Sequence, residues 1–181
     1  MRSLHALALL AVIGTAPLAG QTNRLAPYLA TPPDVVERML TLARVGPGDV
    51  VYDLGCGDGR IVIAAAKAGA RGVGVDIDPA LLAKARLLAQ AAGVSDRATF
   101  IEQDALQADV SDATVVTLYL LSASNVRLRP RLTAQLPPGA RIVAHNFNMG
   151  DWEPDVVQTF VDTAGATRTL YLWTADGRPR P

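Results

Sequence analysis

The chain has 181 residues, 17 Lys and Arg balanced by 17 Asp and Glu, a hydrophobic half and one cysteine. This length suits one domain with a substantial core, and a neutral balance without a Lys/Arg cluster argues against nucleic acid as the principal ligand. A lone Cys56 excludes an internal disulfide, and with only two histidines no Cys/His cluster has metal-ligand spacing, so we expect no metal site.

The first twenty residues have the pattern of a secretory signal peptide. Arg2 and His5 precede an apolar run over 6–13, and small residues follow up to Gly20. The run is shorter than the about 20 apolar residues of a spanning helix, so we expect no stable membrane span. The pattern predicts that residues 1–20 direct export, periplasmic or secreted, and that 21–181 form one domain. A buried first helix or an uncleaved anchor, with the domain facing the cytoplasm, is the alternative.

From residue 26, short β-branched runs alternate with Ala- and Leu-rich helical stretches, which predicts βαβ units. Thr31 is expected to cap a first helix at Pro32 and Pro33. Further helices are predicted at about 60–68, after Asp78, and in 122–136, where Pro130 is expected to confine the regular helix to the second half. Strands are predicted at 49–54, 72–76, 98–102, 113–119 and 140–145, with a final hairpin of 156–161 and 168–174.

These elements predict the fold class α/β: a doubly wound, mostly parallel sheet with helices on both faces and a C-terminal antiparallel hairpin. No internal repeat or interdomain linker interrupts residues 21–181.

A glycine-rich turn follows the first predicted strand. It reads Asp53-Leu54-Gly55-Cys56-Gly57-Asp58-Gly59, and glycines there let a ligand approach the backbone without a Cβ in the way. Asp76 stands 21 positions after Gly55, at the end of the next strand, where a carboxylate can accept both hydroxyl hydrogens of a ribose. The combination predicts a ligand that contains a nucleoside.

The glycine spacing indicates which nucleoside. A dinucleotide fingerprint would place its third glycine at Arg60, and no Walker loop is present. Asp53 also fits poorly beside a pyrophosphate, to which it would add like charge. A carboxylate there suits an amino group, as at the amino-acid end of a sulfonium nucleoside.

At these residues the sequence resembles the class I, seven-strand S-adenosylmethionine-dependent methyltransferases, with Asp53 to Gly59 as first motif and Gln103-Asp104-Ala105 after the third strand. The resemblance implies a Rossmann-like methyltransferase with S-adenosylmethionine as its cofactor. It implies the loop around the methionine part, Asp76 at the ribose and Ile77 on the adenine face. The implied cofactor-binding residues are Tyr28, Asp53, Gly55, Cys56, Gly57, Asp76, Ile77, Asp104 and Ala105, with Asp104 at the adenine amino group and Tyr28 as a lid over the methionine end.

A narrower resemblance lies in Ala26-Pro27-Tyr28, in Thr31-Pro32 and in Tyr52 to Val62. These stretches are similar to small lysine methyltransferases of archaea and of mitochondrial ATP synthase c-subunits, which implies a protein lysine as one acceptor. The sequence departs from that pattern at Cys56, where serine is usual, and at Asp76, where glutamate is usual. His145-Asn146-Phe147 has no assigned counterpart.

Several side chains near the loop have two interpretations. Cys56 between two glycines is interpreted as a small filling residue rather than a nucleophile. Asp58 is expected to cap the following helix, and Arg60 to reach another carboxylate. Tyr119 and His145 end two strands at the ligand-binding edge and are the candidate catalytic residues, with His145 either a proton acceptor or a hydrogen-bonded structural residue.

The predicted function is methyl transfer from S-adenosylmethionine to an N or O nucleophile. The segment after Tyr119 lacks the Asn/Asp-Pro-Pro-Tyr motif of enzymes that methylate nucleic-acid amino groups. Export would separate the enzyme from its cytoplasmic cofactor, which leaves two alternatives open. These are an exported non-catalytic nucleoside-binding module and a methyltransferase of small hydroxy or amino metabolites.

Overall fold

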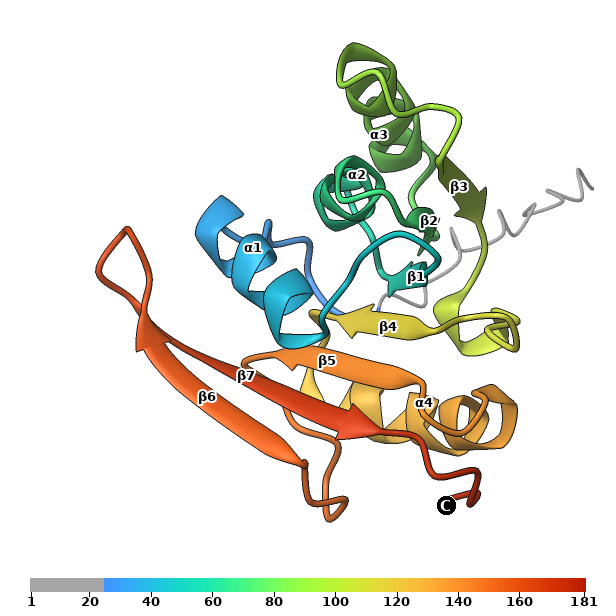
Figure 1. The fold of residues 1–181 in the computed structure, drawn as a ribbon, viewed down its shortest axis with the longest axis vertical. Coiled ribbons are helices and arrows are strands. Elements are labelled where there is room, and N and C mark those ends of the chain that lie inside the picture. Colours follow the sequence, from blue (N-terminus) through green and yellow to red (C-terminus); the bar gives the residue numbers. More distant parts are fainter. Residues whose placement is uncertain (1–24) are drawn as a thin grey trace, which may run out of the picture.

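The computed structural model describes residues 25–181, so the predicted signal segment 1–20 lies outside the described residues. A seven-stranded sheet of order β3-β2-β1-β4-β5-β7-β6 forms the centre (Figure 1). Its parallel strands are β1 (Val50–Leu54), β2 (Arg71–Asp76), β3 (Ala98–Glu102), β4 (Val115–Leu118) and β5 (Arg141–His145). The hairpin of β6 (Val156–Val161) and β7 (Thr167–Thr174) joins β5 antiparallel. The predicted fold class and the final hairpin are confirmed.

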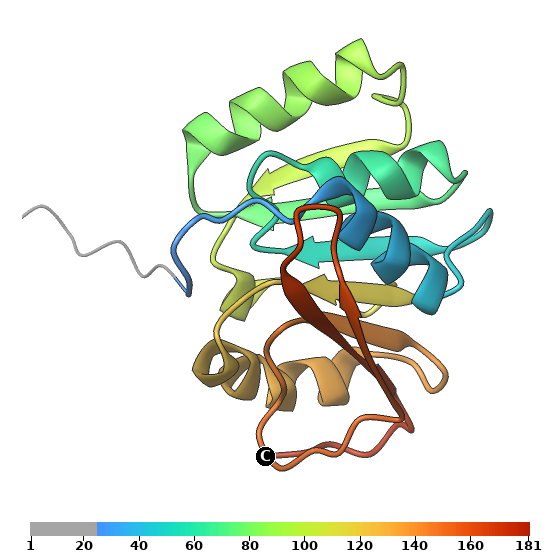
Figure 2. The same ribbon diagram turned by 90° about the vertical axis from the view of Figure 1, so that its left-hand side faces the viewer.

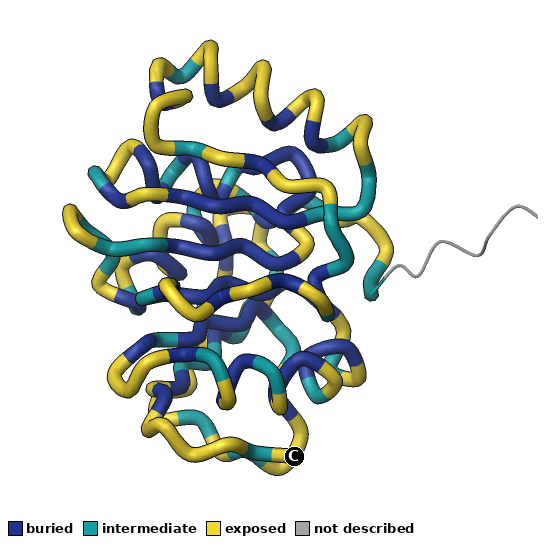
Figure 3. The backbone as a smooth tube through the Cα atoms, turned by 90° about the vertical axis from the view of Figure 1, so that its right-hand side faces the viewer, coloured by how far each residue is buried: buried dark blue, intermediate teal, exposed yellow. Residues whose placement is uncertain are grey.

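Helices cover both faces of this sheet, as the views of Figures 1 and 2 show. One face carries α1 (Pro33–Leu42), α2 (Arg60–Lys67) and α3 (Pro79–Ala91), and the other carries α4 (Ser122–Gln135) and a short 3-10 helix, Ala105–Gln107. The central strands are buried on both faces and therefore read as continuous apolar runs (Figure 3). Strand order reverses between β1 and β4, which opens a crevice at their carboxyl ends.

Two predicted helix details are wrong. Pro32 occupies the N-cap position of α1, and Thr31 is buried with its carbonyl accepting a hydrogen bond from Arg60 Nη1 at 2.9 Å. Helix α4 continues through Pro130 from Ser122 to Gln135. A proline in a helix costs about 3 kcal/mol, but Leu128 and Leu132 are fully buried against the sheet, and burying each contributes about 1.5–3 kcal/mol.

Within residues 25–181, no helix has the length and apolar character that crossing a membrane requires.

Candidate active site

A cleft opens at the carboxyl ends of the parallel strands. Five chain segments that are distant in sequence meet there: residues 25–31 before α1, the glycine loop after β1, and the ends of β2, β3 and β4. All nine residues expected at the cofactor line this cleft, namely Tyr28, Asp53, Gly55, Cys56, Gly57, Asp76, Ile77, Asp104 and Ala105. Tyr119 lines it as well, whereas His145 does not.

The glycine loop is held against the end of β2. The N–H groups of Gly55 and Cys56 both donate to the carbonyl of Val75, at 2.8 and 3.0 Å, and the N–H of Gly57 donates to Asp76 Oδ2 at 2.8 Å. A Cβ on Gly57 would lie 2.5 Å from Cε2 of Tyr28, so this glycine lets the tyrosine ring pack directly on the loop. The loop and the strand-end acid are therefore one structural unit.

Gly59 serves packing rather than ligand approach. It stands at the N-cap of α2 with φ +76°, and a Cβ there would lie 2.5 Å from Phe100 and 2.8 Å from Ala85. We expect Gly59→Ala to lower the free energy of unfolding more than Gly93→Ala, by about 1–3 kcal/mol. Gly93 is a matched control because its φ is +69° with nothing within 4 Å of its Cβ position. Urea titration of both variants measures the difference, and equal losses would contradict the packing role.

Asp53 lies at the bottom of the cleft with 3% of its surface exposed. Its Oδ1 accepts a hydrogen bond from Thr117 Oγ1 at 2.8 Å. Burial raises the pKa of this carboxyl to about 7; the bond from Thr117 opposes the rise, and the Asp76 and Asp58 carboxylates add to it. Asp53 therefore gains most from a ligand that brings a positive charge. Sequence reasoning missed Thr117, although a hydroxyl in the otherwise apolar β4 was a signal for it.

Asp76 is the last residue of β2, and Asp104 follows β3. Both line the cleft on the side away from β4. Asp76 Oδ2 accepts from Gly57 N, and its Oδ1 accepts from Asp78 N at 3.0 Å. Asp104 Oδ1 accepts from Leu106 N at 2.9 Å and so caps the short helix Ala105–Gln107. Backbone donors thus fix the orientation of both carboxylates.

Residues 25–31, called the strap below, cross the cleft ahead of α1. Ser124 Oγ donates to the carbonyl of Leu25, and Arg60 Nη1 donates to the carbonyl of Thr31, so both ends of the strap are anchored. Between these ends, the Tyr28 ring packs on Gly57. The strap is a second element that sequence reasoning missed apart from Tyr28, because its anchors come from α2 and α4.

Asp58 does not cap α2. It forms a two-point ion pair with Arg60, whose Nε and Nη2 lie 2.9 and 2.7 Å from its oxygens, and Lys84 Nζ lies 3.5 Å away. The hydrogen bond from Arg60 lowers the pKa of Asp58 to about 2. The Tyr28 hydroxyl also interacts with Asp58, and burial together with that carboxylate raises the tyrosine pKa. The expectation that Arg60 reaches a carboxylate is confirmed.

Cys56 is buried between the loop and β2. A Cβ on Gly74 would lie 2.7 Å from its sulfur, so the thiol fills the space that this glycine leaves. Burial, reinforced by the nearby Asp53 and Asp76 charges, raises the thiol pKa well above its usual range. A thiol held in its neutral form is a poor nucleophile.

Tyr119 and His145 form a stacked pair with ring centroids 4.0 Å apart. His145 is 0% exposed, and neither ring nitrogen has a hydrogen-bond partner among the described residues. Burial, with a smaller contribution from Arg168, lowers its pKa to about 4. His145 does not line the cleft, and among the described residues it packs against Tyr119, which does.

In the part of the chain that the structure describes, no group of three or more His, Cys, Asp and Glu side chains is arranged to hold a metal ion.

The fold and cleft define a class of protein. A doubly wound sheet with an antiparallel hairpin, a glycine loop after β1 and acids at the ends of β2 and β3 are the features of a Rossmann-like methyltransferase that uses S-adenosylmethionine. A crystal structure of an RNA methyltransferase from Salinibacter ruber in complex with S-adenosyl-L-homocysteine is 52% identical, with a TM-score of 0.77. The match covers 84% of this chain and 97% of that one.

A family model described as the ANTKMT methyltransferase domain matches residues 53–156. A protein-lysine N-methyltransferase of Saccharolobus islandicus is 42% identical over 81% of this chain and 92% of its own length. The adenine nucleotide translocase lysine N-methyltransferase of Mus musculus is 38% identical over 72% of this chain, and the ATP synthase c-subunit lysine N-methyltransferase of Homo sapiens is 33% identical over 77%. The chain spans only 57% and 60% of these two mammalian proteins.

The chain therefore belongs to the ANTKMT methyltransferase family of class I methyltransferases and is an S-adenosylmethionine-dependent enzyme. Methyl transfer, rather than non-catalytic binding, is its function.

Proposed function

We propose that this enzyme methylates the side-chain amine of lysine in a protein. The observation that carries the proposal is the archaeal protein-lysine methyltransferase, which the chain matches over 92% of that relative's length. Four carboxylates, those of Asp53, Asp58, Asp76 and Asp104, line the cleft, and its one lining cation among the described residues, Arg60, is paired with Asp58. This balance of charge suits the positively charged cofactor and not a phosphate group.

The residues of the cleft fit the cofactor. Buried Asp53 suits the amino group of the methionine part, and Asp76 suits the two ribose hydroxyls. The apolar side chains of Ile77 and Leu81 flank the end of the cleft that Asp104 and Ala105 also line, which suits a flat adenine ring. Gly55 and Gly57 bring backbone without a side chain to the centre of the cleft, and the Tyr28 ring packs on Gly57.

When bound, S-adenosylmethionine supplies a methyl group on a positively charged sulfur, which leaves as a neutral thioether. The contribution of the chain itself is to position the acceptor in line with the methyl group. We place the acceptor at Tyr119, the cleft residue at the carboxyl end of β4, and His145 beneath that ring as a positioning residue. The acceptor amine has to be neutral to attack, and its proton leaves to water. Holding the reacting atoms in line contributes roughly 7–11 kcal/mol in favourable cases, so a dedicated base is not required.

Export stays a separate part of the proposal. The pattern of residues 1–20 supports removal of this segment on secretion, with 21–181 as the mature domain. Fractionation of producing cells, with the intact mass of the recovered protein, tests it. A full-length chain in the cytoplasm would contradict it.

The acceptor is tested with the full chain and radiolabelled S-adenosylmethionine in a lysate of its own cells. We expect label that protease removes and RNase does not, and that acid hydrolysis releases as methyllysine. RNase-sensitive label would contradict the proposal and point to the RNA activity named for the Salinibacter ruber protein. Label in small molecules alone would support a metabolite acceptor instead. The variant Asp76→Ala provides the background, because its cofactor site is removed.

A further inference from the structure

Strand β6 is the outer strand of the sheet, and it lacks the charged residues that commonly protect such an edge. Its sequence, Val-Val-Gln-Thr-Phe-Val, carries no charge, and Val157 and Val161 are 55% and 63% exposed. Folded proteins commonly protect such edges with lysines, prolines or bulges, because a free edge templates pairing with another chain. Neither lysine nor proline occurs within β6.

The backbone of β6 offers hydrogen-bonding groups to a partner. Asp162 N donates to Ala166 O, and the pairing register continues that alternation through Phe160 and Gln158. The backbone groups of these even-numbered residues therefore form the hydrogen bonds to β7, because the backbone groups of successive residues in a strand point to opposite sides. The N–H and C=O groups of Val157, Thr159 and Val161 point away from β7 to the free edge.

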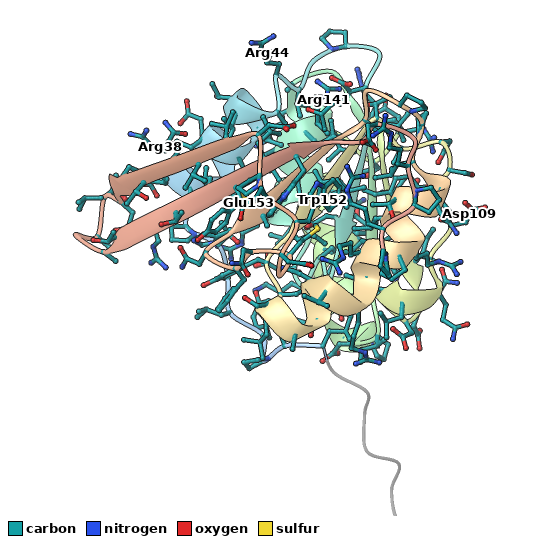
Figure 4. The ribbon with its side chains drawn as sticks, turned by 90° about the horizontal axis from the view of Figure 1, so that it is seen from below. Arg38, Arg44, Asp109, Arg141, Trp152 and Glu153 are labelled. Carbon is teal, nitrogen blue, oxygen red and sulfur yellow. The ribbon has the colours of Figure 1, made fainter. Side chains whose placement is uncertain are left out.

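The two faces of the hairpin differ. On the face toward α1, Phe160 lies beneath the guanidinium of Arg38, 4.3 Å from its ring centroid, and Figure 4 shows Arg38 on that side of the hairpin. The other face carries Val157, Thr159 and Val161 of β6 opposite Tyr171, Thr169 and Thr167 of β7, and none of these six is charged. Figures 1 and 2 show the outer part of the hairpin standing clear of α4.

We propose that two copies of this chain associate through β6, edge to edge and antiparallel, into one continuous sheet. A two-fold axis at Thr159 brings this residue opposite itself and sets Val157 of each copy opposite Val161 of the other. This register uses only the residues whose backbone groups face the free edge, and it pairs the two most exposed valines of the strand.

The charges along the strand are compatible with a second copy as the occupant. In this register Asp155 lies opposite Thr163 and Asp162 opposite Val156, so no like charges meet, and Asp162 is already paired with Arg168 at 2.7 Å. A stable dimer buries about 800 Å² per partner, more than one short strand covers. The dimer is therefore weak and depends on concentration.

Sedimentation velocity of the full chain, from about 1 µM to about 1 mM, tests the association. We expect a dimer that grows with concentration, and a more than tenfold weaker association in Thr159→Lys, because two lysines would face each other across the axis. Thr167→Lys is the matched control, since this exposed threonine shares the face but lies on β7. A wild-type chain that stays monomeric throughout, or equal effects of the two variants, would overturn the proposal.

Cross-linking tests the register. Directly opposite residues of a hydrogen-bonded antiparallel pair have Cα atoms about 5.5 Å apart, which a disulfide can bridge. Thr159→Cys should form a covalent dimer by itself, whereas Val157→Cys and Val161→Cys should cross-link mainly when mixed. Cys56 is buried and serves as the unreactive background. Cross-linking of Thr159→Cys no faster than that of Thr167→Cys would contradict the register. Because β6 does not line the cleft, cofactor binding by every variant should stay at the wild-type value.

Discussion

Replacing Asp76 by alanine is expected to raise the dissociation constant for S-adenosylhomocysteine by at least about 100-fold. Two hydrogen bonds from the ribose hydroxyls to a carboxylate are each worth about 1.5–3 kcal/mol, and every 1.4 kcal/mol is tenfold in affinity. The substitution also removes the acceptor of Gly57 N–H and of Asp78 N–H, which loosens the loop itself. Calorimetric titration of the full chain measures the loss.

Asp76→Asn is the control for the loop. Its amide oxygen can still accept from one backbone N–H, so we expect a thermal midpoint between those of the wild type and Asp76→Ala, with cofactor binding still strongly weakened. Unchanged binding in a well-folded Asp76→Ala protein would show that the ribose assignment is wrong.

Cofactor binding is expected to weaken below pH 7 because of Asp53. Burial holds the pKa of this carboxyl at about 7 in the free protein, whereas a bound ammonium group needs the ionised form. Below that pH, the proton must be removed at a free-energy cost of about 1.4 kcal/mol per pH unit. The dissociation constant should therefore rise up to tenfold for each pH unit between 7 and 5.

Asp53→Asn separates the two consequences of this carboxyl. The variant should bind the cofactor weakly and without the pH dependence, because no titrating group remains at the position. A wild-type dissociation constant that is flat from pH 5 to pH 8 would contradict the assignment of Asp53 to the amino group.

The same substitution is expected to stabilise the ligand-free protein. The folded pKa of Asp53, about 7, lies above its ordinary value of 3.8, so its protonated form favours folding below pH 3.8 and that contribution is lost as the pH rises through 7. Above pH 7, Asp53→Asn should therefore have a free energy of unfolding up to about 4 kcal/mol larger than that of the wild type. Denaturant titration at pH 8 measures the difference. Equal stability at pH 8 would show that the carboxylate is not buried at a cost.

Local patterns in the sequence were sufficient for most of the fold and for the acids and glycines at the ends of β1 and β2. Asp53 and Asp76 lie at the carboxyl ends of these strands, Gly55 and Gly57 follow β1, and parallel strands bring their carboxyl ends to one edge. The place of these residues at one edge of the sheet could therefore be predicted from their positions in the sequence, without knowledge of the packing. The family resemblance then supplied the cofactor, which the comparisons confirm.

Tertiary structure decided what each side chain contacts. Asp58 pairs with Arg60, two residues further along the chain, instead of capping α2. Pro130 stays within α4 because the packing of Leu128 and Leu132 against the sheet outweighs the local preference. Thr117 beneath Asp53 and the strap over Gly57 join residues far apart in sequence, which no local pattern contains. His145 ends β5 as predicted, yet the Tyr119 ring covers it. Strand periodicity determines which edge a residue reaches, and only the packed neighbours determine whether it meets the ligand.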